Sequence, residues 1–289
     1  MTCFEARQAV SAYGHIDYKL YIPKRPSKRP ALLIMLHGCT QDPDDFSVGT
    51  GMNALADRYG FLIAYPHQKR SNNINRCWNW YLPDHQGQIG EPARIVQIVD
   101  DLIAEHGVHP RKIYAAGLSA GGAMAAILGR AYPERFAAIG VHSGVPTEAA
   151  TNVAGAMIAM RHGGRGFVGP GSTRTIIFQG QKDRVVCPKN ADRLAAAEPE
   201  FAQGGLRRKQ ITRNTRVCNR IKLRRQKPQA HVEYWLIDGL GHAWSGGHAP
   251  GSYTDSKGPD ASVEMARFFL SRNWLAHYIL RLLRLLRLK

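Results

Sequence analysis

A serine set between glycines could act as a nucleophile in this chain. Residues 117–122 read Gly-Leu-Ser-Ala-Gly-Gly, after the short apolar stretch 112–117 and before a stretch of helix-forming composition. A sharp turn from strand to helix holds such a serine in a strained conformation and exposes its hydroxyl at the head of the helix. The backbone N–H of Ala120 then faces the same point, aided by the helix dipole. The pattern predicts a nucleophilic Ser119, against the alternative of a glycine-rich turn with an incidental serine.

A serine hydroxyl needs a base and an orienting carboxylate, and both types of residue follow downstream. A neutral imidazole must accept the hydroxyl proton, and a carboxylate fixes the tautomer of that imidazole. His242 follows the apolar segment 232–238, and Asp183 follows the apolar segment 175–180. If both segments are parallel strands, both side chains lie at the same edge of the sheet as Ser119. We therefore predict a triad in the order serine, acid, histidine.

Other histidines and aspartates are less well placed for these roles. His231 precedes the segment that His242 follows, and His248 lies further into the next loop. Asp192 falls in the next helical pattern, and Asp238 is too close in sequence to His242 to face it easily. The alternative for His242 is an ordinary loop histidine.

Acyl transfer also needs a second donor to a developing oxyanion. The apolar segment that ends at His37 is followed by Gly38 and Cys39. The glycine allows the chain to turn and to aim the backbone N–H of Cys39 toward Ser119. We therefore predict an oxyanion hole made by the N–H groups of Cys39 and Ala120. His37 precedes the nucleophile at a strand end, so we expect it to hold this turn by hydrogen bonds.

Short apolar, β-branched runs alternate with helical patterns along the chain. The runs lie at 20–23, 31–37, 61–66, 112–117, 137–143, 175–180 and 232–238. The helical patterns lie at about 50–59, 92–106, 119–132, 188–197 and 260–272. Continuously apolar strands that alternate with helices predict an α/β protein with a mostly parallel sheet, covered by helices on both faces.

The chain is long enough for one large domain, which we place at 1–273. It has 289 residues, of which 44% are hydrophobic and 9% aromatic. A cap-like insertion with a small-residue helix and a glycine-rich loop is expected at about 145–171, and a basic insertion at about 199–230. Residues 274–289 form a basic, leucine-rich tail.

Targeting signals are not evident in the chain as given. It holds no run of 18 apolar residues, and residues 1–20 lack the pattern of a signal peptide. We expect a soluble protein and leave its compartment open, because a leader could already have been removed.

The formal charge of +17 is concentrated in two segments. Residues 207–227 hold ten Lys and Arg without an acid, and residues 281–289 hold four. The other segments hold 25 basic and 22 acidic residues, so they are nearly balanced. No nucleic-acid-binding motif accompanies the charge, and we expect a solvated basic loop without a specific nucleic-acid site. A weak contact with an anionic surface through 207–227 and 274–289 stays open.

The tail could adopt a helix with cations on one side. Arg281, Arg284 and Arg287 are spaced for one broad helical face, and leucines cover most of the remainder. Because leucines nearly encircle the helix, its amphipathic character is weak, and we expect a docked or frayed terminal helix.

Five cysteines are too few for a disulfide scaffold. They are Cys3, Cys39, Cys77, Cys187 and Cys218, and none is spaced for a zinc or redox motif, so we expect no metal. Cys39 and Cys77 both follow strands at the expected active-site edge. We therefore expect a disulfide between them, with two buried free thiols as the alternative.

Three tryptophans lie close in sequence to the expected site. Trp78 and Trp80 stand in RCWNWY, and Trp244 comes two residues after His242. Tryptophan offers a large rigid apolar surface, so we expect these rings to bind substrate. The alternative is that they pack the loops.

These residues together resemble the poly(3-hydroxybutyrate) depolymerase family of esterases, which is related to feruloyl and acetylxylan esterases. The resemblance spans roughly residues 16–272 and rests on the segments LHGCTQDPDDF, RCWNWY, GLSAGGAMA, GQKDRVV, GHAWSGG and GSYTDSKGPDAS. It implies an α/β-hydrolase fold, the triad on Ser119, Asp183 and His242, a mechanism without cofactors and, commonly, secretion. The basic stretch 207–227 and the tail depart from the family pattern.

The hypothesis from sequence is a serine esterase that cleaves hydroxyalkanoate polyester, of the polyhydroxybutyrate type, or its oligomers. The first alternative is a carbohydrate esterase that removes feruloyl or acetyl groups from plant polysaccharide. The second, from another class, is a catalytically silent hydrolase fold that serves as a basic binding module. Labelling of Ser119 by a fluorophosphonate separates the enzymes from the silent module. The acyl group and the oligomeric state stay open.

Overall fold

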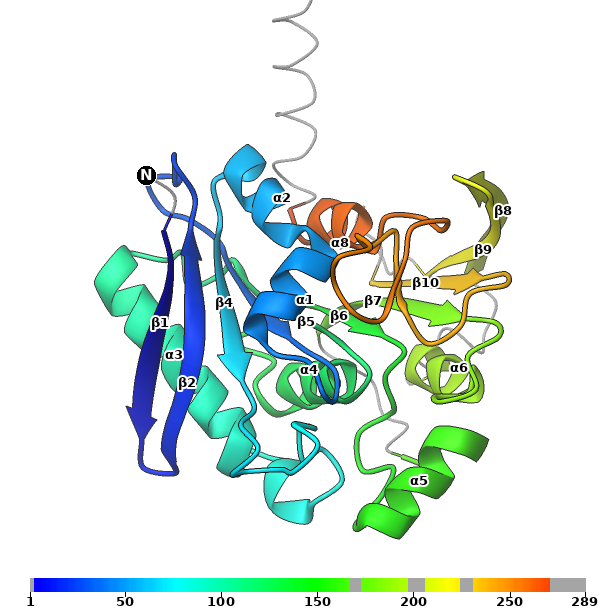
Figure 1. Cartoon of the computed structure of the whole chain (residues 1–289), viewed down its shortest axis with the longest axis horizontal. Coiled ribbons are helices and arrows are strands. Elements are labelled where there is room, and N and C mark those ends of the chain that lie inside the picture. The colour runs from blue at the N-terminus through cyan, green and yellow to red at the C-terminus, as the bar shows by residue number, and fades with distance from the viewer. Residues whose placement is uncertain (1–2, 167–172, 197–205, 224–230, 271–289) are drawn as a thin grey trace, which may run out of the picture.

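The computed structural model describes residues 3–166, 173–196, 206–223 and 231–270. Its parallel strands are β3 (Leu32–Leu36), β4 (Leu62–His67), β5 (Ile113–Leu118), β6 (Ala138–His142), β7 (Arg174–Gly180) and β10 (Val232–Ile237). Antiparallel strands lie at both edges, namely β1 (Cys3–Ser11), β2 (Gly14–Ile22), β8 (Leu206–Arg213) and β9 (Arg216–Leu223). Together they form one ten-stranded sheet in the order β1-β2-β4-β3-β5-β6-β7-β10-β9-β8 (Figure 1).

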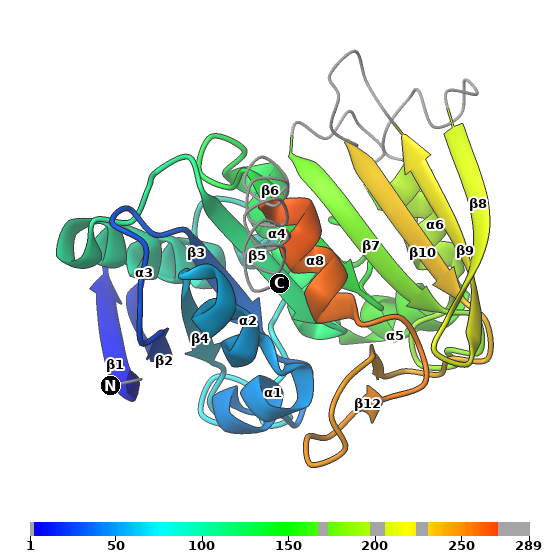
Figure 2. The same ribbon diagram turned by 90° about the horizontal axis from the view of Figure 1, so that it is seen from above.

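Helices cover both faces of this sheet (Figure 2). One face carries α3 (Gly90–His106), α4 (Ala120–Ala131) and α6 (Lys189–Ala196). The other carries α1 (Pro43–Thr50), α2 (Met52–Tyr59) and α8 (Ala261–Phe269). The expectation of a mostly parallel sheet between two helical layers is confirmed.

The buried run in β3 shows why the central strands are apolar throughout. Leu32, Ile34 and Leu36 pack into the core under α3 and α4, whereas Leu33 and Met35 pack into the core under α1, α2 and α8. Successive side chains of a strand point to opposite faces, so a strand covered on both faces needs apolar residues at every position.

Local signals define the helix ends around the site. The side chain of Asp42 accepts from the N–H of Asp45 and so caps α1, and Asp260 caps α8 in the same way through Val263. Gly51, at φ 61°, ends α1 in the left-handed region that favours glycine. The helical pattern expected at about 50–59 corresponds to α2, whereas α1 was not expected.

The basic insertion differs from its expected form. Residues 206–223 form the β8–β9 hairpin, which pairs with β10 and extends the sheet, so the expectation of a solvated loop is wrong for them. Edge strand β1 was also not expected, and the segment expected at 20–23 is the end of the longer β2.

Smaller elements surround the carboxyl edge of the sheet. The segment 145–171 contains α5 (Val153–His162), in agreement with the small-residue helix expected there. A short 3-10 helix, η1 (Pro83–His85), follows the tryptophan motif, and β11 (Trp244–Ser245) pairs with β12 (Thr254–Asp255). The tail 274–289 lies outside the described residues. Within the described ranges, no helix has the length and apolar character needed to cross a membrane.

Candidate active site

Ser119 occupies a strained turn between β5 and α4. Its φ of 56° and ψ of −118° lie outside the ordinary regions for a side-chain-bearing residue. The turn is tight because glycines flank it: a Cβ on Gly121 would lie 2.0 Å from the carbonyl oxygen of Leu36, and one on Gly117 would lie 2.4 Å from the Gly121 carbonyl. The N–H of Ser119 donates to the His142 carbonyl at 2.9 Å, which fixes the turn against β6.

Asp183 and His242 form a hydrogen-bonded pair beside this turn. Asp183 Oδ2 lies 2.8 Å from His242 Nδ1, and Asp183 Oδ1 accepts from the N–H groups of Val185 and Val186, each at 2.9 Å. With Nδ1 donating to the carboxylate, Nε2 is the ring nitrogen left to accept a proton. Burial acts to raise the pKa of Asp183, but the hydrogen bonds from His242 and the two N–H groups outweigh it and hold the pKa below its ordinary value.

The loops that carry this pair touch along their backbones. The N–H of Lys182 donates to the Leu240 carbonyl at 2.9 Å. A Cβ on Gly180 would lie only 2.4 Å from the same oxygen, so the close approach of the two loops needs a glycine there. Parallel pairing of β7 with β10 brings the loops to one edge of the sheet.

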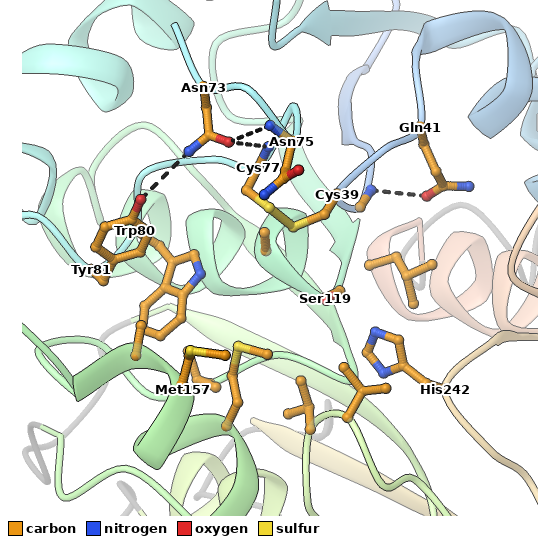
Figure 3. Close-up of a pocket in the computed structure, with 18 of the residues that line it drawn as sticks. Cys39, Gln41, Asn73, Asn75, Cys77, Trp80, Tyr81, Ser119, Met157 and His242 are labelled. Carbon is orange, nitrogen blue, oxygen red and sulfur yellow. Dashed lines mark hydrogen bonds between the residues drawn. A yellow bond between two sulfur atoms is a disulfide. The ribbon is translucent and has the colours of Figure 1, made fainter. Parts of the chain in front are cut away.

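Ser119 and His242 line one cavity of about 340 Å³, together with Gly38, Cys39 and Ala120 (Figure 3). Within the described ranges no hydrogen bond joins the Ser119 hydroxyl to His242. Such contacts are often long in ligand-free enzymes and shorten when substrate binds. Metal-ligating side chains do not gather here: the described residues contain no group of three or more His, Cys, Asp or Glu suited to a metal ion.

Two backbone N–H groups border the cavity beside Ser119. Neither the N–H of Cys39 nor that of Ala120 has an acceptor in the described part of the chain. Both residues line the cavity, and a Cβ on Gly38 would lie 3.7 Å from the Ser119 Cβ, so the two turns are adjacent. Free N–H groups placed in this way can bind an oxyanion.

Gln41 holds the turn that presents Cys39. Its Oε1 accepts from the Gly38 N–H at 2.9 Å, as Figure 3 shows, and its Nε2 donates to Asp45 Oδ2 at 2.9 Å. Ser252 also donates to Asp45, through its backbone N–H at 2.8 Å. This network connects the turn after β3 to α1 and to the loop before β12.

The family model described as esterase PHB depolymerase matches residues 16–201, which is more than half of the chain. The chain belongs to the PHB depolymerase family of esterases.

The chain has curated relatives with different substrates in their names. It is 32% identical over 194 residues to poly(3-hydroxyalkanoate) depolymerase C from Paucimonas lemoignei, covering 61% of this chain and 46% of the relative. It is 32% identical over 144 residues to feruloyl esterase B from Neurospora crassa, covering 48% of each. The chain thus spans about half the length of the curated relatives it matches.

A solved structure shares the fold of this chain. The acetyl xylan esterase from Aspergillus awamori superposes with a TM-score of 0.66 at 19% identity, over 82% of this chain and 94% of that one. At this identity the likeness shows the α/β-hydrolase fold, which confirms the expected fold class.

The expected disulfide is present and forms part of the cavity wall. Cys39 and Cys77 are joined, and the bond lies beside the Ser119 turn in Figure 3. The N–H of Thr40 also donates to the Asn75 carbonyl at 2.7 Å. The turn that carries Cys39 is therefore fixed both covalently and by a hydrogen bond to the loop before Trp78.

Two of the three expected substrate-binding tryptophans do not reach the cavity. Trp78 has no exposed surface and donates from Nε1 to the His37 carbonyl at 3.0 Å. Trp244 is 1% exposed and donates to Ser262 Oγ at 3.0 Å. Their expected role is wrong, because these hydrogen bonds hold both rings in the core, where they pack the loops. Trp80 does line the cavity.

His37 has the structural role expected from its position. Its Nδ1 lies 2.7 Å from the Gly38 carbonyl oxygen, and its Nε2 accepts from the Gln68 N–H at 3.2 Å. Complete burial lowers the pKa of His37 to about 4, so the ring is neutral near pH 7.

His142 was missed by sequence reasoning, although it joins the nucleophile to the loop of His242. Its carbonyl accepts from Ser119, and its Nε2 accepts from the Ser245 N–H at 3.0 Å. The ring stacks on Trp244 with centroids 5.1 Å apart. Burial lowers its pKa to about 3, so it stays a neutral acceptor. The sequence signal that could have identified His142 is its position at the end of an apolar strand.

Two further parts of the cavity wall were also missed. Val153 and Met157 of α5 line the cavity and are 59% and 52% exposed. Tyr253 lines it too, at φ 51°, with its ring centroid 6.5 Å from that of His242 and its hydroxyl 3.3 Å from Thr40 Oγ1. Tyr253 lies in the family segment 251–262, which was recognised without a role for this residue.

Proposed function

We propose that the protein hydrolyses carboxylic esters through an acyl-enzyme on Ser119. The observation that carries this proposal is the pairing of Asp183 with His242 at 2.8 Å in a cavity shared with Ser119. A buried carboxylate that fixes an imidazole next to a strained serine is the arrangement that nucleophilic acyl transfer requires.

The first half of the reaction forms the acyl-enzyme. His242 Nε2 accepts the hydroxyl proton as Ser119 Oγ attacks the ester carbonyl carbon. The carbonyl oxygen becomes an oxyanion and receives hydrogen bonds from the N–H groups of Cys39 and Ala120. The C–O bond to the leaving alcohol then breaks, and His242 delivers its proton to that alcohol.

The second half releases the acid. His242 accepts a proton from a water molecule, whose oxygen attacks the acyl carbon through a second oxyanion in the same position. The bond to Ser119 Oγ breaks, and the serine regains its proton from His242. Asp183 stays ionised throughout and stabilises the imidazolium.

The substrate we infer is a hydroxyalkanoate polyester of the polyhydroxybutyrate type, or its oligomers. Exposed apolar side chains gather at the mouth of the cavity, namely Val153, Met157, Val185 and Tyr253. Exposed apolar patches mark binding sites, and this rim fits the methyl-and-ester surface of a polyester better than a hydroxyl-rich sugar chain. The relative from Paucimonas lemoignei is a depolymerase of this polymer class by name.

A second candidate is a carbohydrate esterase for feruloyl or acetyl groups. Trp80 and Tyr81 line the cavity with ring centroids 5.6 Å apart, and they could hold an aromatic acyl group. Feruloyl esterase B and the acetyl xylan esterase support this alternative.

Hydrolysis of hydroxybutyrate oligomers against feruloyl and acetylxylan esters separates the candidates. We expect the larger kcat/KM on the oligomers, with no turnover by Ser119→Ala. Preference for a sugar ester would favour the second candidate. Failure of a fluorophosphonate to label Ser119 would exclude both and favour the silent binding module.

A further inference from the structure

One face of the β8–β9 hairpin carries like charges at opposing positions of its two strands, which is unfavourable for a sheet. Its register places cations directly opposite one another at three positions, Arg207 with Lys222, Lys209 with Arg220, and Arg213 with Arg216. Like charges in cross-strand pairs destabilise a sheet. Sequences break such local rules mainly where a site needs it, so the charges require an explanation beyond the fold.

The inner row of these cations, on β9, is compensated within the protein. The partners are Asp255 at 2.5 Å for Arg216, Glu233 at 3.0 Å for Lys222, and the ring of Trp235 at 5.2 Å for Arg220. These contacts stabilise β9 against its neighbours.

The outer row, on β8, is not compensated. Arg207, Lys209 and Arg213 are exposed, and none forms an ion pair with a described residue. One charged residue is enough to discourage an edge strand from pairing with another chain. Three cations that also oppose a second cationic row exceed that need. They form a cationic strip in which the half-buried Ile211 lies between Lys209 and Arg213. Arg207 and Arg213 lie six residues apart on one extended strand, so the strip is roughly 20 Å long.

The strip begins at the edge of the sheet that holds the cavity. The hairpin turn is bound to the loop that follows Tyr253, because the Thr215 N–H donates to the Lys257 carbonyl at 3.2 Å and Asn214 Nδ2 donates to the Gly258 carbonyl at 2.8 Å. Tyr253 itself lines the cavity. A surface in contact with the cavity mouth can therefore also approach Arg213.

The occupant must be anionic and extended, and the reaction supplies such a surface. Each hydrolysed ester leaves one new chain end with a carboxylate, so a polyester surface gains negative charge as it is cleaved. The hairpin holds no aromatic residue for stacking on nucleobases. Its one exposed large apolar residue among those described is Val217, which is too little to insert into a membrane.

We propose that the cationic strip Arg207, Lys209 and Arg213 binds chain-end carboxylates of a partly hydrolysed polyester and so holds the enzyme on the surface it cleaves. This rests on the proposed polyester substrate. Arginine suits the role because its guanidinium binds carboxylates with two parallel hydrogen bonds.

The test measures adsorption apart from hydrolysis. The inactive Ser119→Ala chain is added to poly(3-hydroxybutyrate) films treated with alkali to expose carboxylates, and to the same films after methyl esterification. We expect adsorption to the alkali-treated film that declines as salt is raised, and weaker, salt-insensitive adsorption to the esterified film. Adding Arg207→Gln, Lys209→Gln and Arg213→Gln should lower affinity for the alkali-treated film roughly tenfold and leave the esterified film unaffected.

A matched control removes the same charges elsewhere. Arg25→Gln, Lys28→Gln and Arg29→Gln change two arginines and one lysine in an exposed loop before β3, at the opposite end of the parallel strands from Ser119. This variant should adsorb like the parent. In the Ser119 background, both triple variants should turn over a soluble ester at the parental rate, which shows that the fold is intact.

Three outcomes would overturn the proposal. The first is equal adsorption of the parent to both films, and the second is an equal loss of affinity for the alkali-treated film in the hairpin and control variants. The third is hairpin-dependent binding to double-stranded DNA that is tighter than binding to the alkali-treated film. Because adsorption uses an inactive chain, these outcomes are independent of turnover. Absence of oligomer hydrolysis by the Ser119 enzyme would instead contradict the proposed function.

Discussion

Asp183 Oδ2 lies 2.8 Å from His242 Nδ1, although 59 positions separate the two residues in the sequence. Pairing of β7 with β10 explains this proximity. Gly180 and Ile237 are partners at the last position of the ladder, so the loops that follow them begin side by side. The hydrogen bond that orients His242 is thus set by strand register.

Breaking this pair should cripple hydrolysis. Asp183→Asn removes the acceptor that selects the Nδ1–H tautomer, and we expect kcat to fall on the order of 10³-fold or more while the fold is kept. Steady-state kinetics on a soluble ester, with thermal unfolding as the control, measure the effect. Near-normal activity would mean that another carboxylate orients His242.

Nucleophile and base should behave as one unit. Ser119→Ala and His242→Ala should each lower kcat by about 10⁴-fold or more, and the double variant should lose little beyond either single variant. A double variant whose loss equals the product of the single losses would show that the two side chains act independently.

Replacing Trp80 should mainly affect activity, whereas replacing Trp78 should mainly affect stability. Trp80→Ala opens the cavity wall and should lower kcat/KM on hydroxybutyrate oligomers much more than on an acetyl ester, because contacts remote from the reacting carbon are lost only for the longer substrate. Trp78→Ala should instead destabilise the fold by about 3 to 5 kcal/mol. Equal activity losses on both esters for Trp80→Ala would assign that ring to loop packing as well.

Buried histidines should make the protein less stable in acid. Burial lowers the pKa of His142 to about 3 from an unfolded value of about 6.5, so the unfolded chain binds more protons between these pH values. Its contribution to stability is complete above pH about 6.5 and is lost as the pH falls toward about 3. His37, with a pKa of about 4, acts in the same direction.

Chemical unfolding at several pH values tests this linkage. His142→Gln removes one titrating ring, so its free energy of unfolding should fall less steeply with decreasing pH than that of the parent. His15→Gln, at an exposed histidine, is the control and should keep the parental slope. Identical slopes for all three proteins would contradict the assignment.

The disulfide should contribute to both stability and turnover. It closes a loop with a sequence separation of 38, for which chain entropy predicts about 4 kcal/mol of stabilisation. Replacing Cys39 and Cys77 by serine should also lower kcat about tenfold or more with little change in KM, because the Cys39 N–H binds the oxyanion only as it forms. Cys187→Ser, at a free thiol, should have neither effect. A double variant with full kcat would separate the disulfide from the oxyanion turn.

The parallel strands and the residues after them could be predicted because their signals are local. Buried strands such as β3 need apolar residues at every position, and the glycines around Ser119 are required by backbone contacts within the same turn. Strands β8 and β9 could not be predicted in this way. Charged residues interrupt both strands, so neither has the apolar pattern of a buried strand, and pairing with β10 determines their conformation.

Side-chain direction was the other limit of sequence reasoning. The segments that carry Trp78 and Trp244 do lie near the cavity, but their rings turn toward acceptors on His37 and Ser262. Those acceptors come from distant segments, so only the assembled fold determines which loop tryptophan faces the cavity. Trp80 lies only two residues after Trp78 in the sequence, but its ring lines the cavity.

The placement of the β8–β9 hairpin has a consequence for how this lineage can diversify. The hairpin is inserted between α6 and β10 and pairs only on the outer side of β10, away from the strands that precede Ser119 and Asp183. Because β8 is the outermost strand, its exposed cations can be replaced without changing the strand pairs that place Ser119 and Asp183. Surface preference and catalytic chemistry can therefore evolve at separate rates within one chain.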